Sequence, residues 1–391
     1  MNTGTEVRAY NETTKVWDVV TGNLTQGRGY ISVSNSGSGT SNVSFSGTLN
    51  TGTITVPLTR SGSTKPGFNL VGNPYPSYLD WSLVSAANPD VATTMWFRTK
   101  TSGGAYTFST YNTSGNVAVA NGASTTITKY IPPMQAFWVR VNADKTTTDF
   151  SMTNTMRSHA DVSGNRFKAP VQSAQKLVRL EITNGVNIDE AVLYFNENAI
   201  DGFDNYDSQK MINGVASMPE IYTKADNQQL VINGMQKITE NSQYALGYTT
   251  GVAGVLKLKV TELDNFDATT KAYLIDKLEN TETELTTSTE YNFNSSITTN
   301  NESRFSLQFR APGATTSVGT VGKPTIQVFV NAANRIVIIA AEKSNFAIYN
   351  AVGQLIENGI MNMKRETRNA KLNAGVYVVK INNQTTRVIV K

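Results

Sequence analysis

The C-terminal stretch at residues 375–391 reads GVYVVKINNQTTRVIVK, and its alternating pattern is the clearest indication of the fold class. Side chains of a β-strand point alternately to its two faces. The first run therefore has two different faces, with Val376, Val378 and Lys380 on one side and Tyr377, Val379 and Ile381 on the other. Polar residues 382–384 interrupt this run, and a second alternating run follows. The pattern predicts a β-hairpin at the end of the chain.

The same two-residue period recurs upstream, with turn residues between the runs. Examples are residues 54–58, 136–141, 176–183, 255–260, 304–310 and 346–349. Helical periodicity is limited to two short stretches, residues 81–87 and 207–212. Because this alternation is typical of half-buried strands, the sequence predicts an all-β chain. We expect tandem antiparallel β-sandwich domains, the last a small immunoglobulin-like sandwich.

The composition supports this fold class and excludes several functions. Of the 391 residues, 39% are hydrophobic and 16% are charged, which suits sandwiches with polar turns better than helical bundles. The net charge of +4 is spread along the chain. Nucleic-acid binders concentrate their cations on one face, so no nucleic-acid partner is expected. The absence of cysteine excludes disulfides and thiolate metal sites.

Two polar stretches divide the chain. We expect an N-terminal β-sandwich module at residues 1–157, a linker at 158–175 and a second module at 176–310. A second linker, residues 311–323, leads to a C-terminal domain at residues 324–391. Both linkers are small, polar and poor in periodicity, as flexible connections are.

No apolar run reaches the roughly 18–20 residues of a transmembrane helix. The first residues are polar and contain no apolar core of a signal peptide. If the protein is exported, we expect this chain to be a mature form or a fragment of a longer precursor.

The C-terminal segment resembles the sorting domain of the type IX secretion system of Bacteroidetes. Three stretches carry the resemblance: FAIYNAVGQ at residues 346–354, LNAGVYVVKI at 372–381 and RVIVK at 387–391. They occur in the family's order and spacing. The first turn departs from the family pattern, because residues 328–333 lack its two prolines.

This resemblance implies delivery to the outer-membrane surface or the extracellular space, with the type IX secretion machinery as a partner. The residues that it marks as the sorting signal are Gly353, Gly375, Tyr377, Lys380, Arg387 and Lys391. We expect Gly353 to supply a positive φ in a turn, and Gly375 to allow a tight turn into the last hairpin.

Upstream, residues 67–76 read GFNLVGNPYP and residues 131–139 read IPPMQAFWV. Both resemble segments of large surface proteins of the same bacteria. The prolines stop a strand and fix a rigid turn, so the physical interpretation of the first motif is structural.

The sequence contains few residues that could form a catalytic site. His159 is the only histidine, and a lone histidine in a polar stretch is more often a structural hydrogen-bonding residue than part of a catalytic triad or zinc site. Paired carboxylates of the glycosidase type would need two groups that face each other across a cleft. We therefore expect a protein that is not an enzyme and has no cofactor.

Two binding hypotheses remain open. Asp201, Asp204 and Asp207 lie three residues apart, so their oxygens could bind Ca²⁺; the alternative is a solvated loop or a helix cap. Trp96 and Phe97 follow a polar loop, and the sequence predicts them as an exposed platform on which a sugar stacks. The alternative is that these aromatic side chains belong to the core.

The sequence thus predicts a non-catalytic, exported surface protein that acts in cell adhesion or presents a binding surface. Its ligand would be an extracellular protein or glycan. Two alternatives are a carbohydrate-binding module and the C-terminal stalk of a larger adhesin or enzyme.

Overall fold

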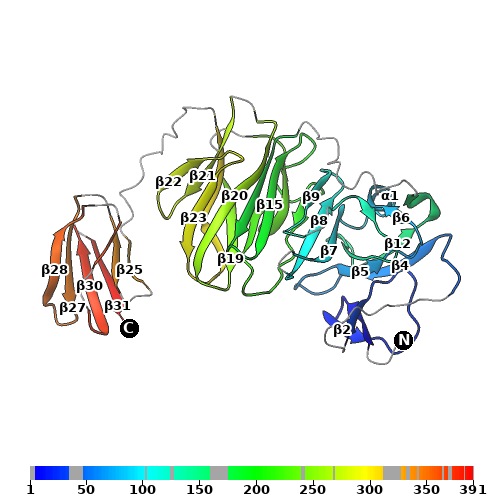
Figure 1. Cartoon of the computed structure of the whole chain (residues 1–391), viewed down its shortest axis with the longest axis horizontal. Helices are drawn as coiled ribbons and strands as arrows, with labels where there is room; N and C mark the ends of the chain where they lie inside the picture. Colours follow the sequence, from blue (N-terminus) through cyan, green and yellow to red (C-terminus); the bar gives the residue numbers. More distant parts are fainter. Residues whose placement is uncertain are drawn as a thin grey trace. The chain divides into compact units, whose positions relative to one another are not determined.

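The computed structural model describes residues 5–34, 47–101, 104–123, 127–158, 175–238, 243–266, 269–310, 327–331, 335–340, 343–362, 365–368, 372–382 and 384–390 (Figure 1). Their regular secondary structure is almost entirely β-strand, with one short α-helix and one 3₁₀ turn, which confirms the predicted fold class. The chain splits into two compact units, Met1–Gly313 and Ala314–Lys391, here called the body and the C-terminal domain. His159 and nearly all of both predicted linkers lie outside the described residues.

The N-terminal part of the body is built on a five-stranded sheet. Its strands, in spatial order, are β5 (Phe68–Gly72), β11 (Ala136–Arg140), β7 (Thr94–Lys100), β8 (Tyr106–Asn112) and β9 (Val117–Val119). Smaller sheets surround it: β12 (Thr147–Met152) with β4 (Ile54–Thr59), and β10 (Tyr130–Ile131) with β6 (Tyr78–Asp80) and β13 (Arg157–Ser158). One face of the large sheet packs on a core that contains Phe137, Phe150 and Trp81.

The sequence prediction of a helix at residues 81–87 is confirmed by α1 (Trp81–Ala87). Asp80 begins it, because its side chain accepts a hydrogen bond from the backbone N–H of Ser82 at 2.9 Å. The only other helical segment in the described part of the chain is a 3₁₀ turn at Asn154–Met156. The second predicted helix, residues 207–212, is wrong, since Ser208–Gln209 form strand β16.

The opposite face of the five-stranded sheet carries an aromatic cluster. A small sheet covers part of it, formed by β1 (Thr5–Asn11), β2 (Val16–Val19) and β3 (Ile31–Ser34). Tyr10 and Trp17 of this sheet meet Trp138 edge-on, with ring centroids 4.9 and 5.9 Å apart. Aromatic pairs prefer this edge-to-face geometry. Glu12, directly after β1, also accepts from the backbone N–H groups of Ser61 and Gly67, so rings and hydrogen bonds together hold the small sheet.

The second part of the body is one 11-stranded sheet. Its order is β22 (Thr281–Glu284), β21 (Lys271–Asp276), β24 (Thr298–Arg310), β19 (Gln243–Thr250), β17 (Glu220–Ala225), β18 (Gln228–Met235), β15 (Ile188–Phe195), β14 (Leu177–Thr183), β20 (Gly254–Asp264) and β23 (Glu290–Ser295), with β16 also paired to β18. The rings of Phe293 on β23 and Phe305 on β24 lie 4.8 Å apart, although their strands are distant in the sheet. The sheet therefore folds over a core of its own as a sandwich. One pair, β15 with β18, is parallel, which the sequence analysis did not predict.

A short segment, residues 205–213, connects the two parts of the body. The Asn112 amide donates to the carbonyls of Asn205 and Asp207, both at 3.0 Å. The Trp96 indole donates to the Gln209 carbonyl at 3.0 Å. Val117 and Val119 of β9 pack in one cluster with side chains of the 11-stranded sheet, beside β15 in Figure 1. These contacts explain why the two predicted modules form one compact unit.

The C-terminal domain is a two-sheet sandwich. One sheet contains β25 (Gln327–Val330), β26 (Ile336–Ile339) and β29 (Arg365–Thr367); the other contains β28 (Leu355–Ile360), β27 (Asn345–Asn350), β30 (Gly375–Ile381) and β31 (Gln384–Val390). The predicted faces of β30 are confirmed, since Tyr377, Val379 and Ile381 are buried in the core. The hairpin turn is one residue shorter than predicted, because Gln384 already pairs with Ile381. That this sandwich has an immunoglobulin-like fold stays a prediction.

The close approach of Gly115 to Tyr194 joins the two parts of the body and can be tested. A Cβ at Gly115 would lie 2.1 Å from the Tyr194 hydroxyl oxygen, which is fixed by its hydrogen bond to the Tyr206 carbonyl. We predict that Gly115→Ala lowers the free energy of unfolding of the body by about 1–3 kcal/mol, as overpacking does. Urea denaturation measures it. The control Gly22→Ala, which has nothing within 4 Å, should leave stability unchanged or slightly raised.

Candidate functional site

The C-terminal domain has an outer sheet face that points away from its core. Strand register defines it: Ala347 on β27 lies opposite Asn358 on β28 and Lys380 on β30. In the next row Val378 lies between Tyr349 and Arg387. The intervening residues of β27 and β30 point inward and are buried. Core and outer face thus alternate along the same strands.

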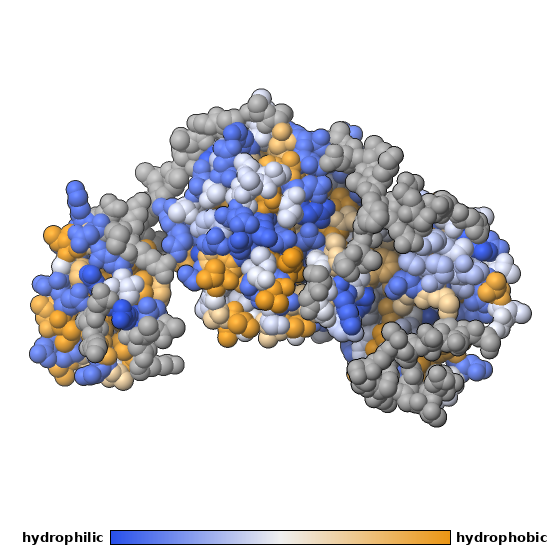
Figure 2. All heavy atoms as spheres, in the orientation of Figure 1, coloured by the Kyte–Doolittle hydropathy of each residue, from blue (hydrophilic) through white to orange (hydrophobic). Residues whose placement is uncertain are grey.

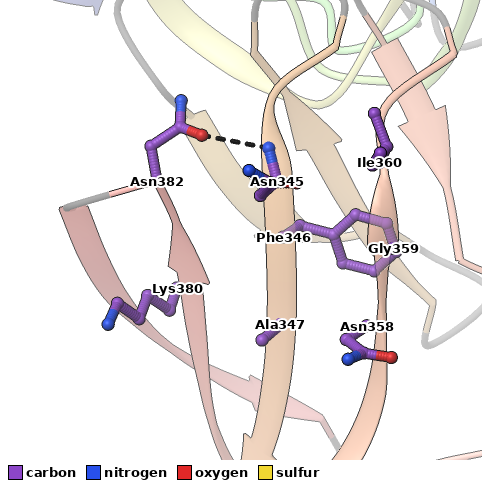
Figure 3. Close-up of a pocket in the computed structure, with 8 residues that line it drawn as sticks. All are labelled: Asn345, Phe346, Ala347, Asn358, Gly359, Ile360, Lys380 and Asn382. Carbon is purple, nitrogen blue, oxygen red and sulfur yellow. Dashed lines mark hydrogen bonds between the residues drawn. The ribbon is translucent and has the colours of Figure 1, made fainter.

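A recess of about 410 Å³ lies on this outer face (Figure 3). Its lining residues are Asn345, Phe346, Ala347, Asn358, Gly359, Ile360, Lys380 and Asn382. The short side chain of Ala347 lies between the longer ones of Asn358 and Lys380, and this difference in length forms the depression. The Phe346 ring points towards Gly359, where a Cβ would lie 3.0 Å from the ring.

The end of the recess is fixed by Asn382, whose φ of 50° places it in the left-handed region of the hairpin turn. Its side-chain oxygen accepts from the backbone N–H of Asn345 at 3.0 Å, and its own N–H donates to the Asn345 carbonyl at 2.9 Å. Its amide also donates to Ser344 Oγ at 3.2 Å. The sequence-predicted turn therefore also shapes the recess.

The outer face is positively charged. Lys380 and Arg387 are both exposed on it. The two acidic side chains among the described residues of this domain, Glu357 and Glu366, pair with Arg368. Neither of them neutralises the outer face, so its charge is available to an acidic partner.

Edge strand β28 borders this face and exposes apolar side chains. Leu355 is 48% exposed and Ile360 57%, and Ile356 is also exposed. In Figure 2 hydrophobic residues lie among hydrophilic ones on the side of the C-terminal domain where Figure 1 labels β28. The strand contains neither lysine nor proline, which usually protect an edge from pairing with another chain. An exposed apolar edge of this kind is typical of an interaction surface.

The structure separates the residues predicted as the sorting signal. Gly353 has φ 82° in the turn between β27 and β28, which confirms its expected conformation. Gly375 is the first residue of strand β30, follows a bend at Ala374 and has no positive φ, and its role in a tight turn stays a prediction. Tyr377 is a core residue whose hydroxyl donates to the Asn373 carbonyl at 2.9 Å. Of the six, Lys380 and Arg387 share the outer face, and Lys391 lies outside the described residues.

Sequence reasoning missed Ala347, Asn358 and Ile360. Their place beside Lys380 depends on the pairing of β27 with β28 and β30, and pairing leaves no local signal in the sequence.

The predicted sugar-stacking platform at Trp96 and Phe97 is wrong. Trp96 is 1% exposed and Phe97 7% exposed. Both faces of β7 are covered at this point: Phe97 packs in the core with Phe137, and Trp96 packs on Phe68 and bonds to Gln209. The alternative, that these rings belong to the core, is correct.

The predicted calcium site is also not formed. Each of its carboxylates accepts a hydrogen bond from a backbone N–H, Asp204 from Ile200 and Tyr206 and Asp201 from Gln236. Asp207 is buried and accepts from Asp204 and Gly234, both at 2.8 Å, and burial raises its pKa to about 7. No group of three or more His, Asp or Glu side chains in the described ranges is placed to hold a metal ion.

A buried charge cluster lies where residues 205–213 meet the 11-stranded sheet. The Lys210 ammonium bonds to Asp189, 2.6 Å from one carboxylate oxygen, and the Ile221 N–H donates to the other at 2.7 Å. Glu220 accepts from the Asn213 N–H at 2.7 Å, while its second oxygen is buried without a partner among the described residues. Burial raises the pKa of Glu220 to about 7, and the Lys210 charge opposes this rise.

The raised pKa of Glu220 predicts a pH-dependent stability. The folded state keeps the proton up to about pH 7, whereas the unfolded chain loses it near pH 4.5, so stability falls as pH rises between these values. We predict that Glu220→Gln removes this contribution. At pH 8 the free energy of unfolding of the variant should be about 2–3 kcal/mol higher than that of the parent. Both proteins should have similar stability at pH 4.

Urea denaturation between pH 4 and pH 8 measures this difference. Asp207, whose pKa is also raised, should retain part of the slope in the variant. Equal slopes for parent and variant would show that Glu220 ionises at its ordinary pKa.

Comparison with known proteins gives two family matches. Residues 3–309 match the family described as "Domain of unknown function (DUF8693)", and residues 327–391 match the "Secretion system C-terminal sorting domain". No curated protein matches the chain. A solved chain described as "Biofilm associated protein - BSP domain" is 7% identical, with coverage of 91% of this chain and 99% of that chain. Its TM-score of 0.18 is too low to support an argument.

Among the described residues, no helix is both long and apolar enough to span a bilayer. The second match agrees with the resemblance seen in the sequence and covers all described residues of the C-terminal domain, including those that line the recess. The chain belongs to the family described as domain of unknown function DUF8693, and it ends in a secretion-system sorting domain.

Proposed function

We propose that this chain is a non-catalytic protein that acts in adhesion or ligand presentation at the cell surface. The sorting domain supplies the location, because cargo of type IX secretion is exported to the surface or the extracellular space. The body would be the part delivered. The observation that carries the proposal is that buried carboxylates of the body are hydrogen-bonded inside the fold.

Three buried carboxylates of the body, those of Asp189, Asp276 and Glu12, are bound by partners within the fold. Asp189 holds Lys210, and Asp276 accepts from the Arg304 guanidinium at 2.8–3.2 Å. Glu12 accepts from the backbone N–H groups of Ser61 and Gly67, at 2.9 and 2.8 Å. Such groups hold loops and strands in place. General acid–base catalysis instead needs carboxyl groups that reach a substrate, so these contacts support a structural and binding role.

We also propose that the outer face of the C-terminal domain is the surface that the secretion machinery binds. Two observations support this role: Lys380 and Arg387 lie together on the face, and the apolar edge strand β28 borders it. Cations give such a surface specificity and a fast encounter with an acidic partner. Apolar contacts with β28 would supply affinity.

Deletion of residues 376–391 in the native host tests the sorting proposal. The deletion removes β30 and β31, which form half of the four-stranded sheet. We predict that the protein stays in the periplasm, as cell fractionation and surface proteolysis would measure. Delivery of the truncated protein to the surface would contradict the proposal.

Charge reversal on the folded domain is the sharper test of the outer face. We predict that Lys380→Glu with Arg387→Glu lowers surface delivery about tenfold or more, since like charges across an interface are repulsive. Both side chains are exposed, so the melting temperature should not change. Lys277→Glu, an exposed cation of the body, serves as the matched control and should be delivered normally. Normal delivery of the double variant would exclude the outer face.

A further inference from the structure

The hairpin of β7 and β8 extends beyond the buried aromatic cluster that contains Trp96, and its far end is exposed to solvent. Beyond Trp96 on the same face of the sheet, Arg98 lies opposite Phe108, and Lys100 lies opposite Tyr106. The Arg98 guanidinium lies 4.4 Å from the centre of the Phe108 ring, and the Lys100 ammonium lies 5.1 Å from that of Tyr106. We call these four residues the β7–β8 patch.

The patch is accessible, unlike the rings that precede it. Tyr106 is 51% exposed, and Arg98 and Lys100 are exposed as well, while Phe108 is partly buried. The small sheet of β1, β2 and β3 covers Trp138 farther along this face. Two cations and two rings thus lie side by side on one face of a hairpin whose other face contributes Phe97 to the core.

The cations of the patch are oriented but not neutralised. One terminal nitrogen of Arg98 donates to the Asn213 side-chain oxygen at 2.9 Å, which anchors the guanidinium to the segment that joins the two parts of the body. An arginine side chain has five N–H donors, so others remain for a ligand. Neither Arg98 nor Lys100 forms an ion pair with a carboxylate of the described residues. Glu220 influences Arg98 electrostatically, but its carboxyl group is buried.

From this geometry we propose that the β7–β8 patch binds an acidic polysaccharide. Carboxylates of the polymer bond to Arg98 and Lys100, and C–H faces of the sugar rings pack on Tyr106. An exposed patch suits an extended polymer, whose neighbouring units make repeated weak contacts. Only two cations lie in the patch, and the net charge of +4 is spread along the chain, so a nucleic acid is a poor fit. The inference rests on the proposed adhesive role and names its ligand class.

Binding of the full chain to polygalacturonate tests this assignment. We expect weak binding that decreases with added salt, and no binding to uncharged dextran. Arg98→Gln and Lys100→Gln should each weaken binding about tenfold, as the loss of one charge-assisted hydrogen bond does. Tyr106→Ala should also weaken binding, but the salt dependence of binding should stay the same. Lys277→Gln, an exposed lysine elsewhere on the body, is the matched control and should bind like the parent.

Three outcomes would overturn the proposal: no binding to polygalacturonate, equal binding to dextran or to single-stranded DNA, or equal binding by the parent and the patch variants. Adhesion of cells that display the chain separates this inference from the proposed function. If displayed parent and Arg98→Gln adhere equally well, the β7–β8 patch is excluded and the adhesive role stands. If the displayed parent confers no adhesion while purified protein still binds the polymer, the adhesive role fails and the site stands.

Discussion

The hydrogen bonds of residues 205–213 with the edge of the five-stranded sheet are the constraint on which the body depends. The Asn112 amide and the Trp96 indole donate to main-chain carbonyls of this segment. A buried carbonyl without a donor costs free energy, so these bonds fix the distance and angle at which the two parts meet. The same segment then places Lys210 against Asp189 inside the fold.

This junction also decides which surfaces remain for binding. It buries Trp96, whereas Arg98 and Lys100, the next positions of β7 on the same face, have no cover of this kind. Asn213, the last residue of the segment, holds Arg98 at the border between the covered and the open surface. The way in which the two parts are joined therefore determines which surface of the body remains open to a ligand.

In the C-terminal domain, side chains alternate between the core and the outer face along β27, β30 and β31. Residues that stabilise the domain are therefore distinct from residues that a partner can contact. Inward side chains of β27, β30 and β31 form the core, and outward side chains of the same sheet border the recess and include Lys380 and Arg387. A substitution on the outer face can therefore change recognition without unfolding the domain. A substitution at a core position such as Tyr377 acts on stability first.

The all-β class, the helix at Trp81–Ala87, the faces of the last hairpin and the sorting domain could all be predicted from the sequence. These features follow from alternation, capping and short motifs, which act between residues close in the chain. Three features became visible only in the folded chain: Trp96 is buried, Asp201, Asp204 and Asp207 accept from backbone N–H groups, and Lys380 borders a recess. Each depends on strands or loops distant in sequence, and a local pattern does not state which distant segment covers a given face.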